Sequence, residues 1–196
     1  MKRLGLTGSI GMGKTTTAAL FAECGVPVFD ADAEVHQLYE LGGEAVDAIA
    51  DLFPGVVENG RVDRQALSRA LQAEPASLPK LNAIVHRHIA ARREKWIKEQ
   101  ALQGAEIVLF DVPLLFETGL HRDMDAVVVV SAPASVQRAR VLARPGMTDA
   151  KFRFILSQQW PDAKKCALAD FVVDTGLGVS SARRQVRDVL KRIGET

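Results

Sequence analysis

The chain has 196 residues, a quarter of them charged, and its acidic and basic residues nearly cancel to a net charge of +1. This length suits one globular unit with attached lobes and excludes several independent domains. The balanced charge gives no overall field for nucleic acid or an anionic membrane, and no apolar run approaches the roughly 18 residues of a membrane-spanning helix.

The start of the chain and its cysteines indicate where the protein works. The N-terminus lacks the apolar region of a secretory signal, so we expect none. The two cysteines, Cys24 and Cys166, have neither the spacing of a metal site nor that of a disulfide framework. We therefore expect reduced thiols and a cytoplasmic protein.

The first predicted strand, residues 2–7, leads into the loop "GSIGMGKT" from Gly8 to Thr15, which fits the phosphate-loop pattern G-x-x-x-x-G-K-[ST]. Glycines there let backbone N–H groups converge on phosphate oxygens. Lys14 is expected near the β- and γ-phosphates, and the Thr15 hydroxyl in a Mg²⁺ shell. The helix expected over residues 14–24 directs its positive end at the same anion. Thr16 and Thr17 are better explained by helix packing.

A second strand, residues 26–29, is followed by "DAD", which contains Asp30 and Asp32. In a parallel sheet this strand is expected to lie near the first, with its carboxyl end facing the phosphate loop. A kinase needs a carboxylate beside its acceptor hydroxyl, and Asp32 is our candidate for that base. The alternative is that either acid caps the helix beginning near residue 33, which is the favoured role for Asp30.

The region from residue 31 to 104 is predicted to be mostly helical. Its last part, residues 79–104, has apolar residues at near-helical spacing and ends at Gly104, where a helix cap is expected. Some seventy residues exceed a simple connection between strands, so we expect an inserted lobe. The histidines His36, His88 and His121 lack metal-ligand spacing and are expected to serve packing or the surface.

A third strand, residues 107–110, ends in Asp111. An acid at the carboxyl end of a parallel strand can hold Mg²⁺ or its waters beside a phosphate loop, although many strands end in Asp for reasons of turn geometry. Further strands are expected at residues 126–130 and 171–173. Because the strands are apolar without alternation, they predict an α/β fold with a five-stranded parallel sheet between two helical layers.

The segment after the fourth strand is predicted to be a lid. A helix over residues 134–143 carries arginines, with Arg140 and Arg144 expected on one helical face. The helix is expected to break at Pro145-Gly146 and to resume in "TDAKFRFILSQQW". Lid arginines can neutralise a transferred phosphoryl group. The ordinary alternative is a solvated basic surface. A last helix is expected over residues 179–193.

Several stretches together resemble the bacterial dephospho-coenzyme A kinases over essentially the whole chain. They are "LTGSIGMGKT", "FDADAEVHQLYE", "GRVDRQALSRAL", "LNAIVHRHI", "DVPLLFETGL" and "LADFVVDTG". The resemblance implies ATP-dependent, Mg²⁺-assisted phosphorylation of the 3′-hydroxyl of the dephospho-coenzyme A ribose, the last step of coenzyme A synthesis. It also implies a P-loop nucleoside-kinase-like fold with a helical substrate lobe and a lid.

The resemblance assigns roles to individual residues. Asp32 is the base, Lys14 and Arg140 act on the phosphoryl group, and Arg144 contacts the nucleotide. The ATP loop falls on Gly8, Gly11, Met12, Gly13, Lys14, Thr15 and Thr16, and the metal on Thr15 and Asp111. The residues implied to contact the substrate, besides Asp32, are His86, Pro113, Leu114, Leu115, Phe116 and Glu117.

This chain departs from the family pattern in three places. It has His86-Arg87 where His-Pro is common, so the helix is expected to run on. Pro145 follows the lid arginine where an acid is common, and Thr175 stands where Asn is common. Neither the phosphate loop nor Asp32 is affected by these departures.

The expected organisation is a nucleotide-binding core of residues 1–33, 104–137 and 166–196, a substrate lobe of residues 34–103 and a lid of residues 138–165. The expected partner is the small molecule dephospho-coenzyme A, with neither nucleic acid nor membrane, in a monomer or weak homo-oligomer. A kinase for another nucleoside and a nucleotide-binding switch are the rival interpretations, although a switch needs neither Asp32 nor an arginine-bearing lid.

Overall fold

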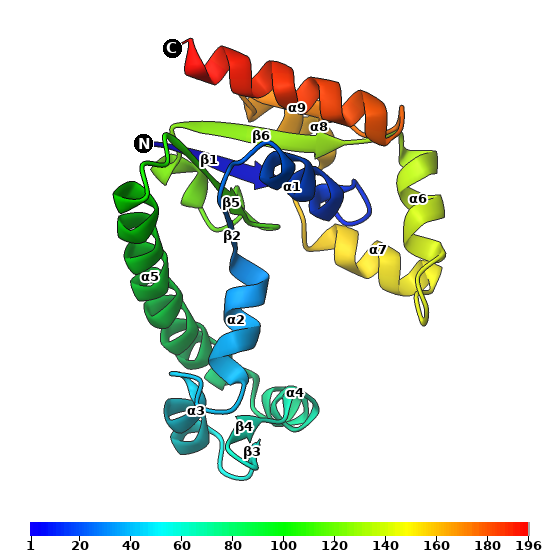
Figure 1. The fold of residues 1–196 in the computed structure, drawn as a ribbon. Coiled ribbons are helices and arrows are strands. Elements are labelled where there is room, and N and C mark those ends of the chain that lie inside the picture. The colour runs from blue at the N-terminus through cyan, green and yellow to red at the C-terminus, as the bar shows by residue number, and fades with distance from the viewer. Residues whose placement is uncertain (196) are drawn as a thin grey trace. The chain divides into compact units, whose positions relative to one another are not determined.

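A computed structural model describes residues 1–195 of the chain, and it divides them into two compact units (Figure 1). The first unit contains Met1–Phe29 and the chain from Gln103 onward, and the second contains Asp30–Leu102. The segment expected to form a lid groups with the first unit. No helix of the described residues is long and apolar enough to cross a membrane.

The first unit is built on a five-stranded sheet of order β2-β5-β1-β6-β7. The strands are β1 (Lys2–Thr7), β2 (Val28–Asp30), β5 (Ile107–Asp111), β6 (Ala126–Ser131) and β7 (Phe171–Asp174), so every predicted strand is confirmed to within two residues. β1 pairs in parallel with β5 and with β6, and β6 with β7. Because β5 lies between β1 and β2, the second strand is not the immediate neighbour of the first.

Helices cover both faces of this sheet, which confirms the predicted three-layer α/β arrangement. Alternate residues of β6 point to opposite faces: Val128 and Val130 pack with α1 (Lys14–Glu23) and α9 (Val179–Gly194). Val127 and Val129 pack on the other face, in a cluster that also contains Cys166 of α8 (Asp162–Leu168). A strand buried on both faces needs continuous apolar residues, which explains the run "AVVVV".

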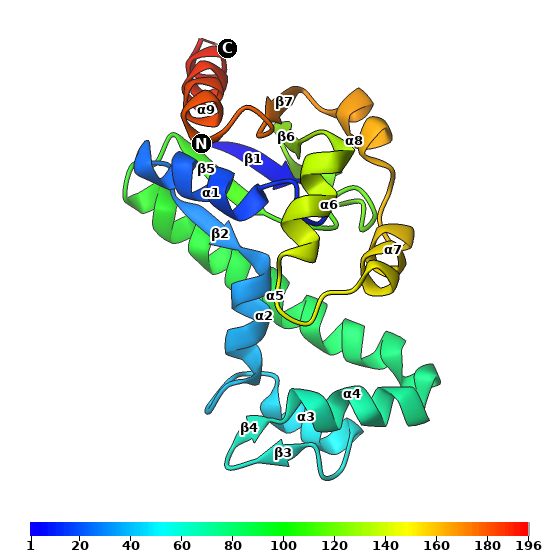
Figure 2. The same ribbon diagram turned by 90° about the vertical axis from the view of Figure 1, so that its right-hand side faces the viewer.

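The segment predicted as a lid, residues 138–165, contains the second half of α6 (Ala134–Leu142) and all of α7 (Asp149–Ser157), and these helices lie side by side (Figure 2). The break between them is at the predicted place, where Gly146 adopts a φ of 71°. Because α6 ends at Leu142, Arg144 lies outside the helix. The expectation that Arg140 and Arg144 share one helical face is therefore wrong.

The second unit is mostly helical, as predicted. It contains α2 (Ala31–Tyr39), α3 (Val46–Leu52), α4 (Arg64–Ala73), the 3₁₀ turn η1 (Pro75–Ser77) and α5 (Leu78–Leu102). A short hairpin of β3 (Val57–Glu58) and β4 (Arg61–Val62) was not predicted, because its strands are too short for a periodic pattern. α5 runs unbroken through His86-Arg87, as expected without proline, and its apolar face packs in the unit's own core with Leu38, Ile49 and Leu67.

Candidate active site

The phosphate loop joins β1 to α1 and depends on its glycines. Gly11 and Gly13 have φ angles of 78° and 95°, in the left-handed region that side chains disfavour. At Gly8, an added Cβ would lie 2.7 Å from the backbone oxygen of Val130. Sterics therefore require glycine at all three positions, and α1 begins at Lys14 with Gly13 as its N-cap.

Lys14 and Asp111 meet beside this loop, as the sequence suggested for residues serving one site. The Lys14 Nζ lies 2.6 Å from Oδ1 of Asp111, which ends β5 and is 3% exposed. The pairing follows from the sheet order, since β5 is hydrogen-bonded directly to β1. A cation and a nearly buried carboxylate are thus held at the carboxyl edge of the sheet, where open α/β sheets bind ligands.

The oxygen donors near the loop fit a magnesium ion. Thr15 is exposed in the first turn of α1, and Asp111 contributes a carboxylate from the neighbouring strand. Among the described residues, no group of three or more His, Cys, Asp or Glu side chains could hold a metal by itself. Mg²⁺ usually takes one or two protein ligands and completes its shell with water and substrate phosphates.

Arg140 of α6 is held by a single residue at the end of β7. Its guanidinium donates to the Thr175 hydroxyl at 2.9 Å and to the Thr175 carbonyl at 2.8 Å. Thr175 itself is 6% exposed and bonds to the phosphate loop. Arg140 therefore lies near the loop, whereas Arg144 is exposed beyond the end of α6.

The segment "DVPLLFE" after β5 divides into an accessible and a buried part. The Leu114 side chain is 39% exposed, and the Pro113 carbonyl accepts a hydrogen bond from Thr7. Leu115 and Phe116 are 0% and 3% exposed and belong to the core of the first unit. Their side chains are taken up by packing, which argues against the substrate contacts that the resemblance implied for them.

Glu117 forms a buried network rather than standing open to solvent. Its Oε1 lies 2.9 Å from Nζ of Lys165, which is fully buried, and accepts from the backbone N–H of Trp160 at 2.7 Å. Burial alone would raise the pKa of Glu117, but the hydrogen bonds from Lys165 and Trp160 outweigh it and keep this pKa below its usual range. Glu117 thus ties the "DVPLLFE" segment to the chain between α7 and α8.

The second unit carries the candidate base. Asp30 accepts from the Ala33 N–H at 3.0 Å and caps α2, which confirms its favoured role. Asp32 lies in the first turn of that helix and is exposed. His86, on α5, is exposed as well.

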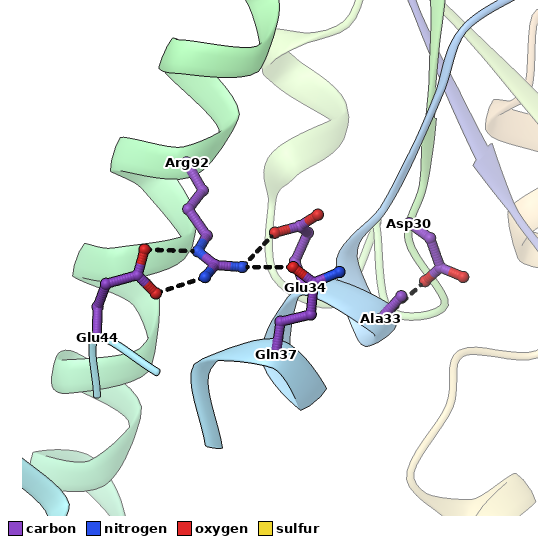
Figure 3. A network of polar contacts seen from close by, with 6 residues as sticks. All are labelled: Asp30, Ala33, Glu34, Gln37, Glu44 and Arg92. Carbon is purple, nitrogen blue, oxygen red and sulfur yellow. Dashed lines mark hydrogen bonds and ion pairs between the residues drawn. The ribbon is translucent and has the colours of Figure 1, made fainter. Parts of the chain in front are cut away.

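Arg92 of α5 fixes the helix that carries Asp32. Figure 3 shows its guanidinium between Glu44 on one side and Glu34 and Gln37 of α2 on the other. Its shortest contacts are 2.7 Å to Glu34 and 2.5 Å to Glu44. Since Glu34 is two residues from Asp32 along α2, this network orients the first turns of the helix.

Sequence reasoning missed two residues at the first unit's site, Gln137 and Gln159, and it placed Lys165 among the basic residues of the lid without its partner Glu117. Gln137 donates to the Ile10 carbonyl at 2.8 Å, and Gln159 accepts from the Ile10 N–H at 3.0 Å. Neither glutamine stands in a local motif that assigns it a partner. The sequence of α8, "DAKKCAL", does not show that Lys165 is the lysine that is fully buried, because Lys164 stands directly beside it.

Comparisons with known proteins show the family to which the chain is similar. The family model for dephospho-CoA kinase matches residues 3–180. A dephospho-CoA kinase from Rhodopseudomonas palustris is 53% identical over 97% of this chain and 94% of its own length. A crystal structure from Thermus thermophilus covers 97% of both chains with 32% identity and a TM-score of 0.83.

A dephospho-CoA kinase structure from Campylobacter jejuni has the same fold at 20% identity, with a TM-score of 0.73 over 98% of this chain and 97% of its own. The family match spans the phosphate loop, Asp32, Asp111 and the arginine-bearing helix. With a relative more than half identical over nearly its full length, the chain belongs to the dephospho-CoA kinase family.

Proposed function

We propose that this protein transfers the γ-phosphoryl group of ATP to the 3′-hydroxyl of the dephospho-coenzyme A ribose, giving coenzyme A and ADP. The observation that carries the proposal is the phosphate loop with Lys14 paired to Asp111, found in a chain of the dephospho-CoA kinase family. The loop supplies N–H donors for the phosphates, and Lys14 supplies a cation that can exchange Asp111 for phosphate oxygens.

Asp32 would accept or orient the proton of the attacking hydroxyl. Its support is its place in the chain, because it follows directly on β2 and its carboxylate is exposed. Arg140 would stabilise the charge on the transferred group, since Thr175 holds it near the loop. Of the segment after Asp111, Leu114 and Pro113 remain the better candidates for substrate contact, together with His86 from the second unit.

Thr15 and Asp111 would hold Mg²⁺, which supplies positive charge to neutralise the β- and γ-phosphates during transfer. Met12, Gly13 and Thr16 complete the proposed nucleotide contacts, with Arg144 available from the lid segment. The lid of residues 138–165 and the substrate lobe of residues 34–103 would exclude water, because an open site would spend ATP on hydrolysis.

The cytoplasmic location stays a prediction from the sequence. The monomeric or weakly associated state stays a prediction, which sedimentation of the purified protein measures.

The deciding experiment is a coupled assay of ADP release with ATP and Mg²⁺, using dephospho-coenzyme A, a panel of nucleosides and no acceptor in parallel. We expect the highest kcat/KM with dephospho-coenzyme A and a product carrying phosphate on the ribose 3′-oxygen. A higher kcat/KM with a nucleoside would show that the nucleoside, and not dephospho-coenzyme A, is the acceptor. Equal slow hydrolysis in every reaction would indicate a nucleotide switch instead.

A further inference from the structure

We propose that Gln137 and Thr175 are positioning residues that turn the Ile10 and Met12 carbonyl groups of the phosphate loop outward and so aim the N–H groups of Gly11 and Gly13 at the nucleotide. The inference rests on the proposed binding of ATP at this loop, but not on the identity of the acceptor. Both residues belong to the first unit. The Thr175 position is one where the family commonly has Asn.

Gln137 fixes the first of these peptide groups. It is 6% exposed on α6, and its Nε2 donates to the Ile10 carbonyl at 2.8 Å. Only the amide nitrogen can make this bond, because a carbonyl oxygen accepts and never donates. The described chain has no cis peptide bonds, so the N–H of Gly11 points opposite to the Ile10 carbonyl.

Thr175 fixes the second peptide group in the same way. Its Oγ1 lies 2.6 Å from the Met12 carbonyl. Arg140 donates to this hydroxyl oxygen at 2.9 Å, and the Ser131 carbonyl is a second acceptor at 3.3 Å. The single hydroxyl proton goes to the nearer Met12 carbonyl, which makes the shorter bond. The N–H of Gly13 then points away from Thr175, again because the peptide is trans.

The packing around the two glycines supports this reading. A Cβ on Gly11 would lie 2.4 Å from a Val141 methyl of α6, and a Cβ on Gly13 would lie 3.1 Å from the Thr175 hydroxyl oxygen. Gln159 holds the Ile10 N–H at 3.0 Å from the other end of the lid segment. The loop is therefore clamped from outside by α6, by the end of β7 and by the chain after α7.

The two bonds matter because a carbonyl facing a triphosphate would repel it. A loop whose carbonyls are already bonded elsewhere presents its N–H groups without reorganising when the nucleotide arrives, which is the electrostatic preorganisation that favours binding and transfer. If a carbonyl is released, its peptide can rotate, and one charge-assisted N–H contact with the phosphates is lost.

The test uses matched variants and measures ATP affinity by calorimetry without any acceptor. Thr175→Val keeps the shape of the side chain and removes its hydroxyl group, whereas Thr175→Ser keeps the hydroxyl group. Gln137→Met keeps the length and removes the donor. Gln158→Met is the control, since the exposed side chain of Gln158 donates to its neighbour Ser157 and not to the phosphate loop. We expect Thr175→Val and Gln137→Met each to raise the Kd for ATP about tenfold.

Thr175→Ser and Gln158→Met are expected to stay within about threefold of the parent affinity. Amide hydrogen exchange without nucleotide gives a second readout, because Gln137→Met should change exchange at Gly11 without touching Arg140. If Thr175→Val and Gln137→Met lower Tm but bind ATP as tightly as the parent protein, the two residues are structural and the proposal is overturned. If the parent binds ATP but does not phosphorylate dephospho-coenzyme A, the function fails while this inference stands.

Discussion

At the scale of single residues, the acids near the predicted site have separate tasks. Asp30 is occupied as the cap of α2, and Asp111 is paired with Lys14. Asp32, by contrast, is exposed, so its carboxylate is accessible to a substrate. The two acids of "DAD" are therefore not interchangeable, although their chemistry is the same.

The Asp32→Asn variant tests the base. We expect kcat to fall by at least about 10²-fold, because a positioned general base contributes 10² to 10⁴, while the Kd for ATP stays nearly unchanged. Steady-state kinetics and calorimetry measure the two quantities. The Asp30→Asn variant is the matched control, since asparagine also caps helices and should keep most of the activity. Near-parental turnover in Asp32→Asn would remove Asp32 from the role of base.

The Lys14→Ala variant tests the phosphate loop. Loss of the ammonium group is expected to lower kcat by about 10²- to 10³-fold, the range found when one charge-stabilising donor is removed. Circular dichroism serves as the check on folding, because Asp111 loses its ion-pair partner in this variant. A folded Lys14→Ala protein with ordinary kinase activity would contradict the assignment of the loop.

At the scale of elements, buried charges tie segments together that are distant in the sequence. Lys165 of α8 pairs with Glu117, and the same carboxylate accepts from Trp160 in the chain after α7. The Trp160 ring stacks on Phe116 and lies under the Lys164 ammonium, which is 3.5 Å from the ring centroid. The segment after β5 and the end of the lid segment are thus joined at several points.

The Lys165→Met variant tests this joint. Removing one partner of a buried pair is expected to lower the free energy of unfolding by about 3–5 kcal/mol at pH 7, because Glu117 would stay buried and charged. Urea unfolding measures the loss, and the double variant Lys165→Met with Glu117→Leu should recover much of it. An unchanged free energy in the single variant would show that the pair contributes little.

The same pair predicts how stability depends on pH. The pKa of Glu117 is lowered in the folded protein, so its stabilisation is complete above the ordinary value of 4.5 and is lost as the pH falls through the lower folded-state pKa. In urea unfolding, the Glu117→Gln variant should therefore show a flatter fall in stability below about pH 4.5 than the parent. Equal slopes would contradict the pKa shift.

Helix α2 depends on Arg92 in a comparable way, but at a more exposed position. The Arg92→Lys variant keeps the positive charge but loses the planar guanidinium group, whose several N–H donors reach Glu34, Gln37 and Glu44 at the same time. We expect faster amide hydrogen exchange in α2 and a loss of about 1 kcal/mol, since the pairs are partly exposed. The Lys95→Arg variant, at a solvated pair with Glu99, is the control that should change neither quantity.

At the scale of the whole molecule, each unit has its own core. The first unit packs helices on both faces of its sheet, and the second buries the apolar faces of α2 to α5 around Leu38 and Ile49. The nucleotide loop and its clamps all belong to the first unit, whereas Asp32 and Arg92 belong to the second. The residues proposed for donor binding and the proposed base Asp32 therefore belong to separate cores.

Nucleotide binding is expected to stabilise the folded protein as a whole. With ATP at about one hundred times its Kd, the gain is about 2.7 kcal/mol. For a chain of this length that corresponds to a rise in Tm of roughly 5–10 °C. Differential scanning fluorimetry measures it, with the Lys14→Ala variant as control. If the Tm of the parent protein does not change when ATP is added, the proposed nucleotide site is contradicted.

The sequence by itself determined the strands of the sheet and the conformation of the phosphate loop. Near-continuous apolar runs predicted the strands of the sheet, because burial on both faces demands them, and the glycine spacing predicted the phosphate loop, because its backbone geometry is a local requirement. The break at Pro145-Gly146 and the cap at Asp30 were likewise predictable, since turns and caps are decided within a few residues.

Only the tertiary structure decided which side chains serve the site and which serve the core. "DVPLLFE" reads as one motif, yet Leu115 and Phe116 are buried while Leu114 is exposed. The partners of Glu117 and of the Ile10 carbonyl lie 48 and 127 residues away along the chain. Such contacts are set by how the segments pack around the sheet, and a local pattern carries no information about a partner so distant.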